Sequence, residues 1–242
     1  MRSRVVREAA LVLAFYYLYQ TIRRLADTGN NKTRAYANAI RLVDLEKTLG
    51  IFTEHTIQRA FLPFRWLIKS MNIYYGTLHF IVTAGLLIWL FVRHHEVYRR
   101  MRNLLGATTA LALIGYWTFP LAPPRLYSCN CFVDTLDTVG GLWSYHSSAA
   151  KAIANNYAAM PSLHFGWALW CAVVLFQFAR HRVTRALCVL YPLLTLFAIV
   201  VTANHYWLDA VGGAVIFGGG LGVVRLIDKI SLRRRTAAAA KA

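Results

Sequence analysis

Charge is scarce in this chain, and acidic charge is the scarcest. Only 15% of its 242 residues are charged, with 10 Asp and Glu against 27 Lys and Arg. A soluble domain carries about 25% charged residues. The charges are also clustered, with long uncharged runs between the clusters, while 57% of the residues are hydrophobic. The composition therefore excludes an ordinary soluble domain and predicts an integral membrane protein.

The excess of basic residues gives a formal net charge of +17. These residues flank the apolar runs instead of lining one face or groove, so nucleic acid is not an expected partner. The bias of basic residues towards the cytoplasmic side of membranes, together with attraction to anionic head groups, explains them better. Anionic membrane lipids are therefore expected partners.

Cysteine is also scarce, and the four that occur predict no disulfide framework. Cys171 and Cys188 fall in apolar runs, where a thiol packs as a small hydrophobe. Cys129 and Cys131 lie in a loop one residue apart, which is too close for an unstrained disulfide, so we assign them no role. No small-residue cleavage pattern follows the first apolar run, which indicates an uncleaved anchor.

Six apolar runs are candidate membrane spans, since a spanning helix needs about 20 apolar residues. They cover residues 9–22, 72–92, 103–119, 163–179, 186–203 and 209–224. Pro192 predicts a kink in the fifth run, and the glycines of the sixth predict close helix contact. The predicted fold is all-α: a polytopic membrane bundle of six transmembrane helices.

The long loop between the first two spans contains an amphipathic segment at residues 34–50. Its apolar positions lie near one helical face: Ala35, Ala39, Leu42, Val43, Leu45 and Leu49. This pattern predicts an interfacial helix on the membrane surface, and residues 55–66 are a candidate for a second. We find no repeat or linker, so residues 1–242 are one predicted domain, with a catalytic core at 72–228 and a basic disordered tail at 231–242.

Basic residues gather before the first span, between the second and third, and between the fourth and fifth. Six passes place these clusters and the basic tail on one side, which the positive-inside rule makes cytoplasmic. The expected location is a bacterial plasma membrane, with both termini in the cytoplasm. Residues 23–71 conflict with this orientation, because they carry nine Lys and Arg on the predicted outer side.

Three short motifs place polar groups at or near the ends of the predicted spans. They are Pro120-Leu-Ala-Pro-Pro-Arg125, Met160-Pro-Ser-Leu-His164 and Asn204-His-Tyr-Trp-Leu-Asp209. With six spans, all three emerge on the extracytoplasmic face. Polar groups at membrane depth are costly and mark functional sites. We therefore predict one active site on that face.

The motifs contain the groups that phosphoryl transfer requires. His205 and Asp209 are four residues apart and share a helix face, so the carboxylate can hold one ring nitrogen while the other attacks phosphorus. His164 can protonate the leaving oxygen. Arg125 offers a planar fork for phosphate oxygens, and Ser162 opens a helix whose N–H groups point at a bound anion. These groups need neither a metal nor another cofactor.

Alternative interpretations of several residues stay open. Asp209 is also suited to cap a helix, and Arg125 to anchor the chain at the interface. Lys151 is either a plain loop charge or a phosphate ligand. His79, in the middle of the second span, either bonds a neighbouring helix or reaches the substrate head group.

The order of the motifs resembles a known family. Arg125, then Pro161-Ser-Leu-His164, then His205 and Asp209 before Gly212-Gly213, are similar to the type 2 phosphatidic acid phosphatase superfamily, which includes the vanadium haloperoxidases. Within it, Leu163 in place of the commoner Gly and the stretch Ala-Pro-Pro-Arg-Leu resemble fungal inositol phosphorylceramide synthases and their bacterial relatives. The resemblance covers roughly residues 40–220.

This resemblance implies a six-helix core and a set of roles. His205 would be the nucleophile, Asp209 its partner and His164 the general acid, with Arg125 and Ser162 on the phosphate. Two cationic phosphate ligands of the superfamily are missing, since their positions hold Thr118 and Ala198-Ile199. The candidate substitutes are Lys151, Asn155 and Asn156. The weaker clamp favours a phosphodiester, which carries less charge than a monoester.

The expected function is that of a membrane lipid phosphotransferase or phosphatase that acts through a phosphohistidine. It would move a phosphoryl or phospho-alcohol group, with inositol phosphate as one candidate, from a phospholipid or polyprenyl phosphate to an alcohol or water. The alternatives are a plain lipid or polyprenyl phosphate phosphatase and, in another class, a non-catalytic lipid-binding or transport protein. The intact His164, His205 and Asp209 argue against the last.

Overall fold

The computed structural model describes residues 2–25, 29–127, 129, 131–142 and 157–239. Lys151, Asn155 and Asn156 therefore lie outside the described residues. The elements are α1 (Arg2–Leu25), α2 (Gly29–Thr48), α3 (Glu54–Phe61), α4 (Arg65–Ile73), the π-helical turn η1 (Tyr74–Leu78), α5 (His79–Arg93), α6 (His95–Thr118), the 3-10 turn η2 (Pro124–Leu126), α7 (Thr135–Thr138), α9 (Leu163–Phe178), α10 (Arg182–Val201) and α11 (Trp207–Ala239). The described part of the chain is all helical and contains one isolated β-bridge, between Leu121 and Ala158.

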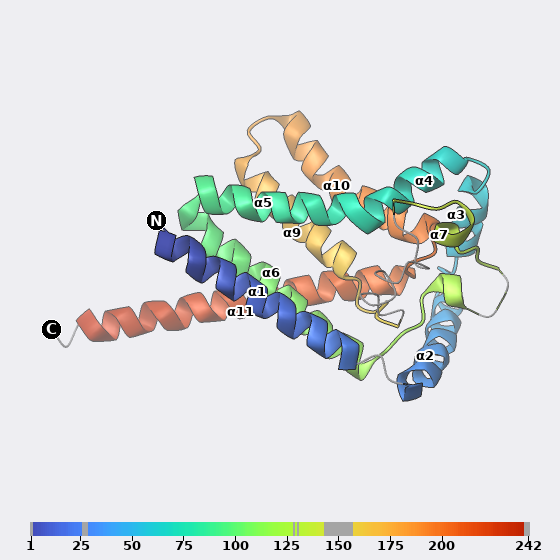
Figure 1. Cartoon of the computed structure of the whole chain (residues 1–242), viewed down its shortest axis with the longest axis horizontal. Helices are drawn as coiled ribbons and strands as arrows, with labels where there is room; N and C mark the ends of the chain where they lie inside the picture. Colours follow the sequence, from blue (N-terminus) through green and yellow to red (C-terminus); the bar gives the residue numbers. More distant parts are fainter. Residues whose placement is uncertain (1, 26–28, 128, 130, 143–156, 240–242) are drawn as a thin grey trace.

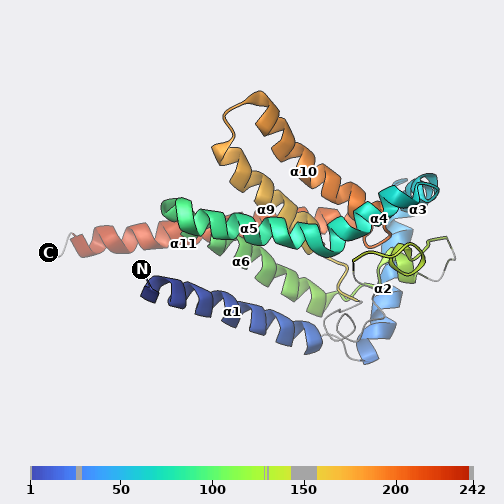
Figure 2. The same ribbon diagram turned by 45° about the horizontal axis from the view of Figure 1, so that its top comes forward.

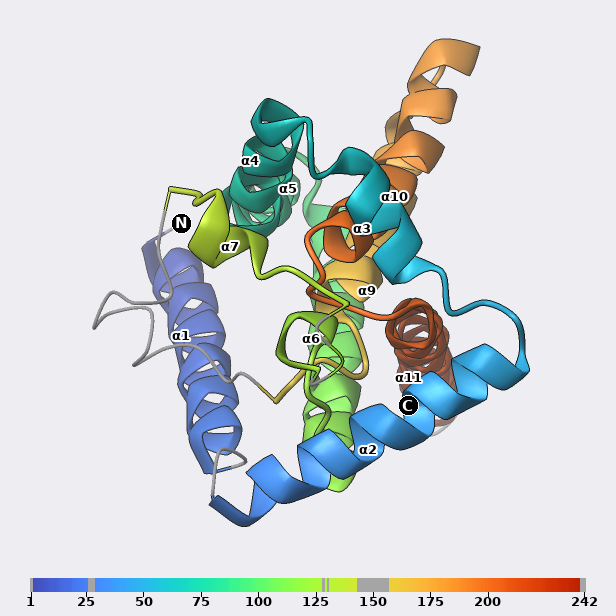
Figure 3. The same cartoon turned by 90° about the vertical axis from the view of Figure 1, so that its right-hand side faces the viewer.

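The long helices α1, α5, α6, α9, α10 and α11 run broadly along the longest axis of the molecule (Figure 1). Both termini lie at one end of this bundle. At the other end α2 runs across the ends of α6 and α11, while α3 lies beside α10 and α7 beside α4 (Figure 3). The α9–α10 hairpin leans away from α1 (Figure 2). The first long loop therefore covers the end where the three polar motifs lie.

Three helical segments in the described residues are long and apolar enough to cross a membrane: Arg65–Arg93, Arg182–Val201 and Trp207–Arg233. The apolar helix Leu163–Phe178 is shorter. These agree with four of the predicted spans, whereas α1 and α6 do not meet the same criterion, so six spans are not confirmed. In α6 the reason is its polar first third, which carries Glu96, Arg99, Arg100 and Arg102, so that the apolar run begins only at Leu104. The bundle has the composition of a membrane protein.

The apolar core explains why α6 occupies the middle of the bundle. Leu104 of α6 packs with Leu90 of α5, Trp170 of α9 and Phe217 of α11. The indole N–H of Trp170 donates to the carbonyl of Met101 at 2.8 Å, so the one polar atom of that ring is satisfied inside the core. α6 is thus held by side chains from three neighbouring helices.

Close backbone contact joins α9 to α11 at the start of α9. A Cβ at Gly213 would lie 2.5 Å from the carbonyl oxygen of Ser162. The prediction that glycines of the last span permit close contact therefore applies at Gly213, but not at Gly218 or Gly222, where a Cβ would meet nothing within 4 Å. This contact fixes the motif that contains His164 against the helix that contains Asp209.

The amphipathic helix predicted over 34–50 is present as α2, with a different buried face. Ala35, Ala39 and the pair Leu42-Val43 are buried, but Leu45 and Leu49 are exposed. The buried face packs on Leu121, Ala122 and Tyr206, so α2 contacts the bundle itself. The single helix suggested for 55–66 is wrong, since α3 ends at Phe61 and Pro63 separates it from α4.

Two further expectations are corrected. The tail expected to be disordered from residue 231 is helical through Ala239, because Ala, Leu and Arg are strong helix formers and no Pro or Gly interrupts them. Cys129 and Cys131 form a disulfide. Their Cα atoms are 5.1 Å apart, inside the range that disulfides use, so closeness in sequence did not prevent pairing.

Candidate active site

A tight turn after α10 presents His205. Ala203 has a positive φ of 55°, a conformation that non-glycine residues adopt rarely. The N–H groups of Asn204 and His205 then both donate to the carbonyl of Ile199, at 3.0 and 3.1 Å. The turn reverses the chain and leaves His205 buried, directly before the first turn of α11.

Asp209 holds the His205 ring from the first turn of α11. Its Oδ2 lies 3.2 Å from Nδ1 of His205 and accepts the backbone N–H of Tyr206 at 3.0 Å. Both interpretations left open for Asp209 are therefore compatible with the structure, since it caps α11 and also pairs with the histidine. A carboxylate on Nδ1 selects the tautomer whose Nε2 carries the free lone pair.

His164 lies opposite His205. It is the second residue of α9, and the two ring centroids are 5.8 Å apart. Tyr75 stacks on His164 with a centroid distance of 4.0 Å and an interplanar angle of 21°. The same tyrosine ring lies 6.3 Å from His205. The structure thus brings together the two histidines that the sequence predicts to share a site.

The three motifs are joined by backbone hydrogen bonds. The N–H of Arg125 donates to the carbonyl of Ala203, and the N–H of Ser162 donates to the carbonyl of Asp209, both at 2.9 Å. The hydroxyl of the buried Ser162 caps α9 by accepting the N–H of Phe165 at 3.4 Å. The phosphate-binding role expected for Ser162 stays a prediction, because these contacts are all within the protein.

Arg125 lies beside the residue that precedes His205. Its Nη1 donates to the side-chain oxygen of Asn204 at 2.7 Å, and its Nε lies 3.4 Å from a carboxylate oxygen of Asp134. Its side chain is only 6% exposed, so an interfacial anchor pointing into head groups does not describe it. The guanidinium is held next to the site by two polar side chains.

His79 is completely buried at the start of α5. Its Nδ1 lies 3.1 Å from the hydroxyl of Tyr191 on α10, and its ring centroid is 5.3 Å from that of His164. The hydrogen bond to a neighbouring helix, one of its two proposed roles, is therefore present. Its place behind His164 leaves the second role, contact with the substrate head group, as a prediction.

Sequence reasoning missed several residues that the structure places at the site. Sequence patterning assigns no role at the site to Tyr75, Glu46 or Glu54. The burial of Glu46 could have been predicted from the sequence, because it lies four residues after Leu42 and seven after Ala39 and so shares their helix face. A charged residue on an apolar helix face is unusual in a chain with ten acidic residues.

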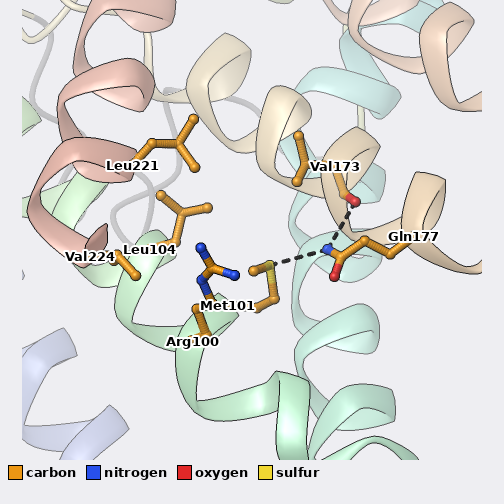
Figure 4. Close-up of a pocket in the computed structure, with 7 residues that line it drawn as sticks. All are labelled: Arg100, Met101, Leu104, Val173, Gln177, Leu221 and Val224. Atoms are coloured by element: carbon orange, nitrogen blue, oxygen red, sulfur yellow. Dashed lines mark hydrogen bonds between the residues drawn. The ribbon is translucent and has the colours of Figure 1, made fainter. Parts of the chain in front are cut away.

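A pocket lies elsewhere in the bundle, between α6, α9 and α11 (Figure 4). It is lined by Arg100, Met101, Leu104, Val173, Gln177, Leu221 and Val224. Because Leu221 is 14 residues beyond Trp207 on α11, the pocket lies roughly 20 Å along the bundle from the first turn of that helix. It does not belong to the site of the three motifs. Among the described residues no group of three or more His, Cys, Asp or Glu side chains could hold a metal ion.

Comparison with known families decides the class of the protein. A family model described as the PAP2 superfamily matches residues 40–223, most of the chain. The chain belongs to the PAP2 superfamily. As a PAP2 protein it is an enzyme of the phosphatase and phosphotransferase kind that acts on lipid phosphates, and the resemblance inferred from its motifs is confirmed at that level.

The narrower resemblance has no such support. No curated protein and no solved structure matches this PAP2 protein. The branch of the inositol phosphorylceramide synthases therefore stays a proposal, as do the substrate and the roles of individual residues. What the structure adds is their geometry.

Proposed function

We propose that this PAP2 protein transfers a phosphoryl or phospho-alcohol group from a lipid donor to an alcohol or to water, through a phosphohistidine on His205. The observation that carries the proposal is the pairing of His205 Nδ1 with the buried Asp209, with the ring of His164 5.8 Å away. A nucleophile, the group that orients it and an acid are the parts that such a transfer needs.

The proposed reaction has two displacement steps. Nε2 of His205 attacks phosphorus, the bond from phosphorus to the leaving oxygen breaks, and His164 donates a proton to that oxygen. An acceptor hydroxyl then attacks the phosphohistidine while His164 takes its proton, and the P–N bond breaks to return His205. Asp209 stabilises the positive charge that develops on the imidazole of His205 in the first step.

The charge near the site favours a phosphodiester donor. Arg125 is the cation that the three motifs contribute, and it is already paired with Asp134. The buried carboxyl groups of Asp209, Glu46 and Glu54 lie around the start of α11. A dianionic monoester would meet more repulsion here than a singly charged diester. We therefore favour transfer of a phospho-alcohol group, with inositol phosphate as a candidate, over plain hydrolysis of a lipid or polyprenyl phosphate.

We also propose that the site faces the extracytoplasmic side of the membrane. The termini and the basic turns that follow α5 and α9 lie at one end of the bundle, and the three motifs lie at the other (Figure 1). The positive-inside rule makes the basic end cytoplasmic. The disulfide between Cys129 and Cys131 follows η2 at the motif end, which fits an oxidising compartment.

The test is turnover of defined lipids by the purified protein. Phosphatidic acid, phosphatidylinositol and a polyprenyl phosphate, each labelled at phosphorus, are incubated with and without an added alcohol. We expect wild type to form product and an acid-labile phosphoprotein, and His205→Ala to form neither. His94→Ala serves as the matched control, because His94 lies at the far end of the bundle against Trp89 and Phe178.

The outcomes separate the alternatives. Product that depends on the alcohol identifies a phosphotransferase, and release of inorganic phosphate alone identifies a phosphatase. Product formation that persists in His205→Ala contradicts the mechanism. No turnover on any of the three lipids favours the non-catalytic lipid binder.

A further inference from the structure

Two buried glutamates from the first third of the chain cap α11. The N–H of Trp207 donates to Oε1 of Glu54 at 3.0 Å, and the N–H of Leu208 donates to Oε1 of Glu46 at 2.9 Å. The N–H of the preceding residue, Tyr206, donates to Oδ2 of Asp209. The first N–H groups of a helix have no partner within it, so each of three completely buried carboxyl groups satisfies one of them.

Glu46 and Glu54 have no cationic partner in the described part of the chain, where neither forms an ion pair. The titratable groups that face Glu46 are Glu54 from α3 and Asp209 from α11, with Tyr206 beside all three. All of these groups are neutral or negative. Three ionised carboxylates in a buried space would repel one another strongly.

The surroundings of the second oxygen of each glutamate indicate how this repulsion is avoided. Oε2 of Glu46 and Oε2 of Glu54 are buried, and no donor group in the described part of the chain reaches them. The two carboxyl groups nevertheless lie close to each other, because they accept the N–H groups of the consecutive residues Trp207 and Leu208. Two carboxylate oxygens are both acceptors, so such a contact is favourable only with a proton between them.

Other features favour the same arrangement. Burial, followed by the contact with Glu54, raises the pKa of Glu46 to about 9. Glu46 is in the last turn of α2, where the helix dipole disfavours a negative charge, whereas Glu54 is the first residue of α3, where the dipole favours one. The proton therefore belongs on Glu46.

We propose that Glu46 and Glu54 form a carboxyl–carboxylate pair that shares one proton and positions the first turn of α11 for the reaction. The proposal rests on the function proposed above, because the turn that the pair holds carries Asp209 and, through it, orients His205. Neither glutamate touches the reacting atoms in this scheme. They are positioning residues that tie α2 and α3 to the nucleophile.

Substitutions at Glu46 test the shared proton. In Glu46→Gln the amide oxygen still accepts the N–H of Leu208, and an amide N–H replaces the proton shared with Glu54. We expect its kcat at neutral pH to stay within about threefold of wild type. We expect the ratio of its kcat to that of wild type to rise above about pH 9, where wild type loses the proton on Glu46. Glu46→Ala leaves both partners unpaired, so we expect kcat to fall about 10- to 100-fold with KM unchanged.

Glu96 provides the matched control. It is an exposed glutamate in the first turn of α6, and we expect Glu96→Gln and Glu96→Ala to alter neither kcat nor the pH profile of the labelled-lipid reaction. Loss of activity in Glu46→Gln at every pH, as large as that in Glu46→Ala, would overturn the proposal, since it would show that a second negative charge is needed at this position.

Infrared difference spectroscopy gives a readout that needs neither substrate nor the alanine variant. A protonated carboxyl group has a carbonyl stretch distinct from that of a carboxylate. We expect wild type to show this band at neutral pH and to lose it on alkaline titration, and Glu46→Gln to lack it. A wild-type band that Glu46→Gln retains, or no band in wild type, refutes the shared proton. The infrared measurement does not depend on turnover, so its result would stand even if the phosphohistidine mechanism were wrong.

Discussion

The contact between Gly213 and Ser162 predicts that alanine at Gly213 destabilises the protein, whereas alanine at Gly218 on the same helix stabilises it. A Cβ added at Gly213 would lie 2.5 Å from the Ser162 carbonyl oxygen and 3.3 Å from the backbone nitrogen of Gly166. These are backbone atoms, so no rotamer change can relieve the overlap. Because the overlap is with fixed backbone atoms, its cost falls in the upper part of the range for overpacking, about 2–3 kcal/mol, and the helix propensity of alanine offsets about 1 kcal/mol of it.

We therefore expect Gly213→Ala to lower the free energy of unfolding by about 1–2 kcal/mol. At Gly218 a Cβ would meet nothing within 4 Å, so Gly218→Ala should raise it by up to about 1 kcal/mol. The resulting difference of about 1–3 kcal/mol corresponds to roughly 2–12 °C in melting temperature for a chain of this size.

Thermal unfolding of both variants in the same detergent measures this difference directly. Activity provides a second readout, because separating α9 from α11 moves His164 relative to Asp209, and a displacement of about 1 Å can cost about 100-fold in rate. Equal melting temperatures for Gly213→Ala and Gly218→Ala would show that the two helices do not approach as closely as described here.

Three further predictions concern the site. Asp209→Asn should lower kcat by about 10²–10⁴-fold, because an amide N–H facing Nδ1 of His205 places the ring proton on Nε2, the nitrogen that must attack phosphorus. The protein should stay folded, because the amide oxygen can still cap α11. Turnover and melting temperature measured together check this. Glu46→Gln should flatten the pH dependence of stability: the pKa of Glu46 is raised from 4.5 to about 9, so between these values the folded state holds a proton that the unfolded state has lost, and the free energy of unfolding falls as pH rises, by up to about 1.4 kcal/mol per unit. A melting curve recorded from pH 5 to about pH 9 in both proteins tests the sign. Arg125→Lys should cost about 1.5–3 kcal/mol in thermal unfolding, because one ammonium group cannot keep the contacts to both Asn204 and Asp134.

The parts of the fold that the sequence predicted correctly follow from local patterning. The apolar runs at 72–92, 186–203 and 209–224 are spanning-length helices in the structure, because uninterrupted hydrophobicity is a local property. The convergence of His164, His205 and Asp209 followed from counting passes through the membrane. Topology of this kind needs only the number of helices and the ends at which polar residues occur.

The parts that were missed depend on contacts between distant residues. Glu46 and Glu54 reach Leu208 and Trp207 across 162 and 153 positions of sequence, and no periodicity encodes such a pairing. The span predicted at α6 stays a prediction, because the charged first turns and the buried Thr and Tyr side chains of this central helix lower its hydropathy. The disulfide between Cys129 and Cys131 was missed for another reason, because their pairing depends on the backbone conformation of one loop.

The capping of α11 by α2 and α3 also bears on how the enzyme is made. The groups that cap the first turn of α11 come from residues 46 and 54, while the proposed nucleophile is His205. A nascent chain therefore cannot complete the proposed site until the last helix has been inserted and the early helices have docked on it. Contacts of such long sequence separation form late in folding. Fragments that lack either end of the chain are therefore expected to be catalytically silent.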